Sequence, residues 1–452
     1  MKSLFLSRSA IETYQTCQQK YQWEYLAFDH GIVPAIPNRA LEIGNAIHMG
    51  MEMLMQLNSH GEEDLLAKIW IAIDGHLNKT FIAYVNTVEK EWTLKKDIVL
   101  AYSLVRAFAI HALPEWKVVP WFIERDTSVN WTTNGYFESK ADYIGWNEEE
   151  KRFKLYNWKS AKYHPMDDGR ADKKFKNDLQ GITESYCIEN AIANDTESLE
   201  QGIKTLNNPP LVAREKLVQI QKMQSQVVKR MKEFKIDSVS YVFFIKGMEI
   251  EEKDFNDAPT GRIISYSPLI RGWRSRAGGG YIYAWTNKVV KEENKSGFGY
   301  LGKGWEEFNV WEAEELGETP RVRIDRWEDM LKAGLQEEMG NPLSQSICIT
   351  SEKFRSDNDT QFTWLVEVYS IMREIEQKII NKEVFRRTRS ACSYPSQCPY
   401  TEGCFRGLSA EDMIRSGEFK EREPHHKMEK EYLDEVKENL NGSKDKEIFP
   451  KY

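Results

Sequence analysis

Residues 135–161 read GYFESKADYIGWNEEEKRFKLYNWKSA, and this stretch decides the fold that we expect. Its two halves are rich in strand-forming aromatic residues, and the polar NEEEK at 147–151 between them is typical of a tight connection. The preceding KVVPWFIERD at 117–126 has the same character. Together these segments predict three successive strands that form a β meander.

Helical periodicity flanks the predicted meander on both sides. Apolar residues at helical intervals predict helices at 9–28, with Ser9 as N-cap, and at 40–56, where Ile47, Met51 and Leu54 share one face. Further helices are expected up to about 112, and then at 172–193, 212–235 and 359–382, with one more strand at 238–247. Residues 254–345 are rich in Gly and Trp and indicate only an irregular, partly β insertion.

This order of elements predicts a mixed α/β fold with a central sheet flanked by helices. We expect five regions. They are an N-terminal helical region at 1–112, an α/β core at 113–193, an insertion with one further core strand at 194–345, a helix and cysteine-rich region at 346–410, and a charged tail at 411–452.

Composition indicates a soluble globular protein of 452 residues, with 41% hydrophobic and 29% charged residues. No run of about 18 apolar residues predicts a membrane span, and the first residues do not resemble a secretory signal, so we expect a cytoplasmic location and no membrane partner. Although the net charge is −8, the chain contains two basic stretches. Residues 151–176 have nine Lys or Arg against three Asp, and residues 212–235 have seven Lys or Arg against two Glu. These stretches suit a polyanion, although solvated helix faces would look the same.

Three cysteines lie close together in ACSYPSQCPYTEGCF, at Cys392, Cys398 and Cys404. Zinc sites usually contain C-x2-C pairs, and none occurs here, whereas an iron–sulfur cluster accepts wider spacing but needs four thiolates. The fourth could come from Cys17, Cys187 or Cys348. A zinc site or three unliganded cysteines remain the alternatives.

Polar residues at the ends of the predicted strands suit metal-assisted phosphodiester hydrolysis. Asn157 and Lys159 project on one side of their strand, and Asp142 lies towards the end of the strand before it. Such chemistry needs oxygen ligands for Mg²⁺, an activated water and a cation near the phosphate. His48 on its helix could add a ligand. Taken singly, each of these residues could equally be a surface, strand-end or turn residue.

The order of these segments along the chain resembles the RecB-like branch of the PD-(D/E)XK nuclease superfamily. The similar segments are SRSAIETYQTCQQKYQWEYL, GNAIH, ESKADYIGW, LYNWKSAK, DLQGITESY and the three cysteines. The likeness is greatest to members with an iron–sulfur cluster, such as AddB-type nucleases, CRISPR-adaptation nucleases and related phage proteins. It implies a restriction-endonuclease-like core at 113–193, a helical layer pinned by the cluster at the two ends of the chain, and a large insertion.

The resemblance also implies roles for individual residues. Cys17, Cys392, Cys398 and Cys404 would hold a [4Fe–4S] cluster; His48 and Asp142, with Asn157, would bind Mg²⁺ or Mn²⁺. Lys159 would orient the water, and Gln180 would help to place that lysine and the DNA. Family members usually have a tyrosine four residues after the glutamine, but here Glu184 stands there and Tyr186 follows.

Residues outside this set are further candidates for contacts with nucleic acid: Lys162, Tyr186, Arg271 and Arg274. Arginines beside Trp273 could meet phosphates and bases, although an arginine-rich turn that only solvates a loop would have the same sequence.

Asn157 is the main departure from the family pattern, because it replaces the Asp or Glu of the (D/E)-x-K motif. An amide oxygen can coordinate a metal but brings no negative charge, so feeble or absent cleavage is expected. Either the motif carboxylate was replaced by Asn157 to trap substrate, or the chain is a natural family member that has lost cleavage. Retention of His48, Asp142 and Lys159 favours the first.

The resemblance implies a metal-dependent DNA nuclease, and specifically an exonuclease acting on single strands or DNA ends, alone or with a helicase, an integrase or another DNA-processing subunit. The alternatives are a non-cleaving nucleic-acid-binding or complex-assembly subunit with a structural cluster, and a zinc-stabilised scaffold without a nucleic-acid role.

Overall fold

The computed structural model describes residues 3–56, 62–85, 88–132, 135–147, 149–161, 179–194, 234–246, 347–349, 353–354, 358–393, 397–424 and 426–442. The predicted basic helix at 212–235 and the insertion at 254–345 therefore lie almost wholly outside the described residues. So do Lys162, Arg271 and Arg274, three of the candidates for contacts with nucleic acid.

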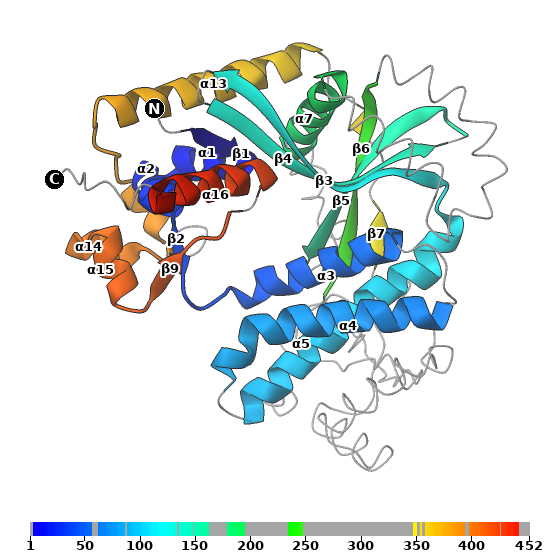
Figure 1. Cartoon of the computed structure of the whole chain (residues 1–452). Helices are drawn as coiled ribbons and strands as arrows, with labels where there is room; N and C mark the ends of the chain where they lie inside the picture. Colours follow the sequence, from blue (N-terminus) through cyan, green and yellow to red (C-terminus); the bar gives the residue numbers. More distant parts are fainter. Residues whose placement is uncertain are drawn as a thin grey trace, which may run out of the picture.

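A seven-stranded mixed sheet forms the centre of the molecule, as the sequence predicts (Figure 1). The path runs β1-β4-β5-β6-β7, with β3 paired to β4 and β8 paired to β6. The pairs β1–β4 and β5–β6 are parallel, and the other pairs are antiparallel. The strands are β1 Leu4–Ser7, β3 Val118–Thr132, β4 Gly135–Asn147, β5 Arg152–Ala161, β6 Ile236–Ile245, β7 Ile347–Ile349 and β8 Lys353–Phe354.

Helices cover both faces of this sheet. One face, which carries Tyr143, Trp158 and Phe244, packs against α3 Arg39–Gln56, α4 Glu62–Phe81 and α5 Val88–Ala107. The other face packs against α7 Gln180–Asn194 through Ile188 and Ile192. These apolar contacts supply the main driving force for folding and fix α3 and α7 on opposite sides of β5.

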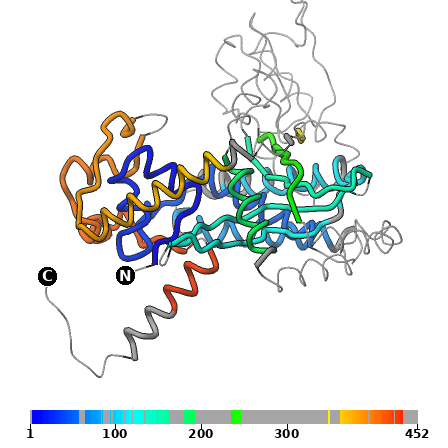
Figure 2. The backbone as a smooth tube through the Cα atoms, turned by 90° about the horizontal axis from the view of Figure 1, so that it is seen from above, coloured from blue at the N-terminus to red at the C-terminus, as the bar shows by residue number. Residues whose placement is uncertain are grey.

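The two ends of the chain pack together beside the sheet. A third apolar core joins β1 and α1 Arg8–Thr16 to α13 Asn358–Ile380, for example through Leu6, Ile11 and Val368. Figure 2 shows the N-terminal and C-terminal segments, in blue and orange, gathered on one side of the molecule. The remaining elements here are α2 Gln18–Tyr21, β2 Ile32–Pro34, α14 Thr401–Arg406, α15 Ala410–Arg415, β9 Phe419–Glu421 and α16 Lys427–Gly442.

The predicted helix at 9–28 is not continuous. It begins after Ser7, whose hydroxyl accepts from the Ala10 N–H, so Ser7 rather than Ser9 is the N-cap. The helix stops at Cys17, which has extended backbone angles of φ −159° and ψ 110°. The sequence prediction was wrong here because the helical periodicity continues through a residue whose backbone leaves the helix.

None of the helices in the described part of the chain has the length and apolar character needed to span a lipid bilayer.

The start of α16 is held against β3 by polar contacts. The Asp126 carboxylate accepts from His426 Nδ1 at 2.7 Å and from the Lys427 N–H at 2.6 Å. Nearby, Arg422 and Glu429 form a buried ion pair. Glu138 on β4 lies among these groups with 2% of its surface exposed, and burial raises the pKa of its carboxyl to about 8.

Replacing Glu138 with Gln is expected to stabilise the protein increasingly as pH rises. A carboxyl whose folded pKa lies above its ordinary value contributes stability at low pH and loses it as pH rises through about 8. Glutamine does not titrate, so the gain should grow to roughly a few kcal/mol between pH 5 and pH 9. Urea unfolding at pH 5, 7 and 9 measures it. If the difference in free energy of unfolding between Glu138→Gln and the unsubstituted chain does not change with pH, Glu138 is not held protonated.

Candidate metal centre

The candidate site lies where the edge of β4 changes its partner. Residues 135–138 of β4 pair with β1, and residues 143–147 pair with β5. Asp142 lies between these two paired stretches, at a fork where β4 changes its partner from β1 to β5. Its Oδ2 accepts the backbone N–H of Trp158 on β5 at 2.8 Å. The fork therefore fixes the carboxylate beside the predicted motif strand.

Glu124 on β3 brings a second carboxylate to the same place. It stands between Ile123 and Arg125, which pair with Tyr143 and Ala141, and so faces Asp142 across the hairpin. Its φ of 49° is unusual for a residue other than glycine and marks a local twist of the strand. Glu124 Oε2 lies 2.7 Å from Lys140 Nζ.

His48 reaches this site from α3. Neighbouring residues Ile47 and Met51 bury the helix against the sheet, while His48 turns towards the strand end. Its Nε2 lies 3.0 Å from the Trp158 carbonyl oxygen, and its Nδ1 lies 3.5 Å from both Glu124 Oε1 and Asp142 Oδ1. Both ring nitrogens of His48 therefore lie close to oxygen atoms of neighbouring residues.

The charges in this group shift one another's ionisation. Burial lowers the pKa of His48, but the carboxylates of Asp142 and Glu124 outweigh it, so the pKa is raised overall. Burial also raises the pKa of Asp142, against the opposing effect of His48 and Lys159. Burial raises the pKa of Glu124, but His48 and Lys140 outweigh it, so the pKa is lowered overall and this carboxyl favours its charged form.

This donor set suits a divalent cation. Ligand atoms of His48, Glu124 and Asp142 all lie within 4.8 Å of one another, and no other such group occurs among the residues that the structure describes. Carboxylate oxygens with one imidazole are ligands that Mg²⁺ and Mn²⁺ accept. The three residues could therefore bind a metal.

Comparison with protein families agrees with this arrangement. A sequence model of the PD-(D/E)XK nuclease superfamily matches residues 6–233, which include the end of β1, then α1, α3, the meander and α7. The chain belongs to the PD-(D/E)XK nuclease superfamily. A search of curated proteins found no match. Members of this superfamily are generally metal-dependent nucleases, so membership implies a nucleic-acid substrate.

Asn157 and Lys159, which the sequence predicts to belong to the motif, lie in the second half of β5. Asn157 is fully buried and its Oδ1 accepts from Gln180 Nε2 at 3.1 Å. Lys159 is partly exposed and interacts electrostatically with His48 and Asp142. The structure thus brings four of the sequence-predicted residues, together with Gln180, around one fork in the sheet.

Gln180 is positioned by several elements at the start of α7. Its Oε1 accepts from Arg8 Nη1 at 3.3 Å, and its Nε2 also donates to Glu184 Oε1 at 2.6 Å. Gly181 lets the helix approach β6, since a Cβ there would come within 2.9 Å of Val239. Any larger residue at 181 would move Gln180 away from the motif strand.

Sequence reasoning missed Glu124 and Glu184. Glu124 lies between Ile123 and Arg125, whose pairing with Tyr143 and Ala141 places it opposite Asp142, and this register was not predicted from the sequence. Glu184 was noticed only as a departure from the family pattern.

Tyr186, a predicted contact with nucleic acid, projects elsewhere. Its hydroxyl oxygen accepts from Trp131 Nε1 at 2.9 Å, and its ring packs edge-on against that indole. This position gives Tyr186 a packing role at the β3–α7 junction.

The four predicted cluster cysteines are free thiols in one part of the fold. Cys17 separates α1 from α2, while the Cys398 N–H donates to the Cys392 carbonyl at 2.9 Å. Burial raises the pKa of the Cys404 thiol, Arg387 lowers it, and Cys392, Cys17 and Cys398 raise it further. Of the other two cysteines, Cys187 is buried near Phe137 and Cys348 lies on β7.

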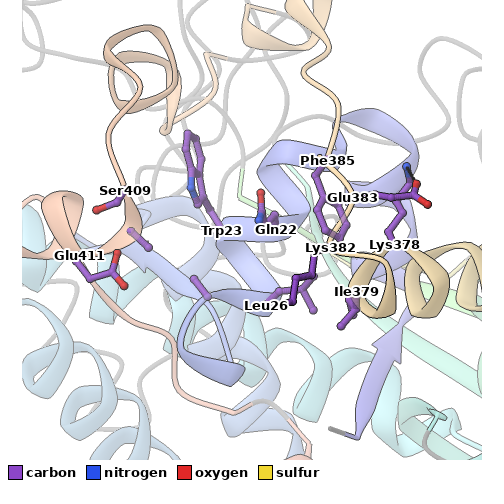
Figure 3. Close-up of a pocket in the computed structure, with 12 residues that line it drawn as sticks. Gln22, Trp23, Leu26, Lys378, Ile379, Lys382, Glu383, Phe385, Ser409 and Glu411 are labelled. Atoms are coloured by element: carbon purple, nitrogen blue, oxygen red, sulfur yellow. Dashed lines mark ion pairs between the residues drawn. The ribbon is translucent and has the colours of Figure 1, made fainter. Parts of the chain in front are cut away.

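A separate cavity of about 540 Å³ lies beside this cysteine region (Figure 3). It is formed by the helical turns that follow α2, the end of α13 and the start of α15, with Trp23, Leu26 and Phe385 among its walls. Lys378 and Glu383 also line the cavity, and the distance from Lys378 Nζ to Glu383 Oε2 is 3.7 Å. The cavity shares no residue with the metal centre.

Proposed function

We propose that this chain is a Mg²⁺- or Mn²⁺-dependent DNA nuclease of the RecB-like branch, acting on single strands or DNA ends and weakened by Asn157. The observation that carries the proposal is the convergence of His48, Glu124 and Asp142 beside the motif strand. The order of the motifs along the chain, from the N-terminal helix to the cysteines, supports the branch.

His48, Asp142 and Glu124 would hold the divalent cation, with the Asn157 oxygen beside them. When bound, the cation supplies Lewis-acid stabilisation of the phosphate and lowers the pKa of a water molecule. Lys159 orients the attacking water and stabilises the negative charge that develops on the phosphate. Gln180 holds Asn157 in place and links it to Arg8 of α1.

A [4Fe–4S] cluster held by Cys17, Cys392, Cys398 and Cys404 is part of the proposal. Among the described residues, the cysteine sulfurs do not form a group within 4.8 Å of one another. Tetrahedral zinc with Zn–S of about 2.3 Å would need sulfurs about 3.8 Å apart. An iron–sulfur cluster binds each thiolate at a different iron and accepts a wider arrangement. The mutual effect of the four thiols on the pKa of Cys404 supports their proximity.

In domain terms, we propose a nuclease core at 113–193 served by helices from 1–112. The 194–345 elaboration would contribute β6 to the sheet, and the 346–410 region would carry three of the cluster ligands. A cytoplasmic location and a helicase or integrase partner stay predictions.

Asn157 favours a second candidate function, that of a non-cleaving DNA-binding or complex-assembly subunit. A neutral amide at this place weakens the affinity for a divalent ion. This candidate predicts salt-sensitive DNA binding that the substitution Asn157→Asp leaves unchanged, since phosphate contacts dominate such binding.

Asp142→Asn and Lys159→Met are each expected to lower cleavage by about 100-fold when made in the Asn157→Asp chain, because each removes charge at the reacting phosphate. End-labelled single strands, blunt duplexes, closed circles and RNA of the same sequence, with Mg²⁺, Mn²⁺ or EDTA, measure rate and substrate choice. Lys430→Met, on the exposed side of α16 and outside both basic stretches, is the control and should not change the rate. Equal rates for Lys159→Met and its control would contradict the assigned site.

A further inference from the structure

The segment between α13 and α14 carries a group of arginines that the metal centre does not use. Residues 384–392 read VFRRTRSAC and contain three arginines and no acidic residue, in a chain whose net charge is −8. The group is separate from the two basic stretches at 151–176 and 212–235. Figure 1 shows the segment leading from the end of α13 to the region of α14 and α15.

The fold fixes the main chain of this segment and leaves its arginines in solvent. Phe385 is buried in the third apolar core with 5% of its surface exposed. The Arg386 N–H donates to Gln18 Oε1 at 3.1 Å, and the Arg386 carbonyl accepts from the Gln19 N–H at 3.0 Å. The segment is thus held on α2 through its backbone, whereas Arg386 and Arg389 are exposed.

Two of the three arginines are available to an anionic partner. In the part of the chain that the structure describes, no carboxylate forms an ion pair with Arg386 or Arg389. Arg387 differs, because its Nη1 donates to the Cys404 carbonyl at 2.9 Å and so ties the segment to the end of α14. The sequence of the segment therefore supplies one arginine to the fold and two to the surface.

An exposed aromatic ring lies beside these arginines. Phe405 directly follows Cys404, whose carbonyl accepts from Arg387, and has 70% of its surface exposed. Guanidinium groups contact the phosphates of a single strand, and an aromatic ring stacks on its unpaired bases. A duplex would use only the arginines, since its bases are already stacked on one another. The combination of charge and ring therefore favours a single strand.

We propose that Arg386, Arg389 and Phe405 form a contact surface for single-stranded DNA beside the cysteine region. The two arginines contact phosphates, and Phe405 stacks on a base. This inference rests on the proposed function and extends it, because it places part of the substrate on a surface outside the metal centre. Binding at this surface needs neither the divalent cation nor a carboxylate at position 157.

Binding of a fluorescent thymidine oligonucleotide to the full chain, without added metal and at increasing KCl, tests the proposal by anisotropy. The double variant Arg386→Met with Arg389→Met should weaken binding by about 10-fold. It should also reduce the slope of log affinity against log salt by about 1.4, since each phosphate contact to a single strand contributes about 0.7. Phe405→Ala should weaken binding by about 10-fold on the thymidine strand and leave binding to an abasic strand of the same length unchanged.

Lys79→Met with Lys430→Met is the matched control. It removes two positive charges at exposed positions on α4 and α16 and should keep the affinity and the salt slope of the unsubstituted chain. Arg386→Lys with Arg389→Lys keeps the charge and should retain most of the affinity. Thermal melts check folding, and single Gln substitutions at 386 and 389 replace the Met pair should that protein not fold.

The outcomes separate this inference from the proposed function. If the unsubstituted chain binds the strand in a salt-sensitive way and the arginine variant matches the lysine control, the inference is overturned and the proposed function stands. Equal losses for Phe405→Ala on thymidine and abasic strands would overturn the stacking role. If the arginine variant loses more affinity for a duplex than for the strand, the choice of a single strand is wrong. Absence of DNA binding by the unsubstituted chain would overturn the proposed function as well.

Discussion

Asn157→Asp is expected to raise the rate of metal-dependent DNA cleavage by about 100-fold, the size of effect that one charged group aimed at a reacting centre produces. The side chain is fully buried in the second half of β5, next to Trp158, whose backbone N–H donates to Asp142, and it accepts from Gln180. Aspartate is nearly isosteric with asparagine, so the change adds charge without disturbing the packing. Initial rates on labelled single-stranded and duplex DNA with Mg²⁺ or Mn²⁺ give the comparison.

Asn381→Asp is a matched control for this gain, since it adds the same charge at the exposed end of α13, away from the site. Unchanged rates, together with salt-sensitive DNA binding in both proteins, would instead favour the non-cleaving subunit.

The second large effect is expected at the cysteine region. Cys404→Ser should abolish the binding of iron and labile sulfide and lower the stability, because a metal group that binds only the folded chain contributes its binding energy to folding. Iron, sulfide and zinc content of anaerobically purified protein, with thermal melts, measure both effects.

Cys348→Ser is the control for this experiment, because Cys348 lies on β7 in the sheet and apart from the other cysteines. It should keep iron and sulfide at the level of the unsubstituted chain. Zinc in place of iron, lost on Cys404→Ser, would support the zinc-bound scaffold and remove the cluster from the proposal.

The spacing of apolar residues was sufficient to predict the main local elements. Strand-forming segments separated by NEEEK predicted β4 and β5, which the structure confirms, and the stripe around Ile47 and Met51 predicted α3. Such patterns are local, so their period reports directly which face of a strand or helix is buried. Where tertiary contacts override the period, as at Cys17, the sequence prediction failed.

The identity of the site residues came from the sequence, but their number and arrangement did not. Residue types and order along the chain indicated His48, Asp142 and Lys159, and also showed that Asn157 departs from the motif. The partner change along β4 that opens the fork, and the left-handed backbone of Glu124 that turns its carboxylate into it, depend on the pairing of distant strands. Burial of Glu184 against Gln180 likewise depends on how α7 packs on the sheet. Sequence determined the chemical groups this protein possesses, whereas only the tertiary structure decided which carboxylates share one low-dielectric space, because charge interactions depend on distance and burial rather than on position in the chain.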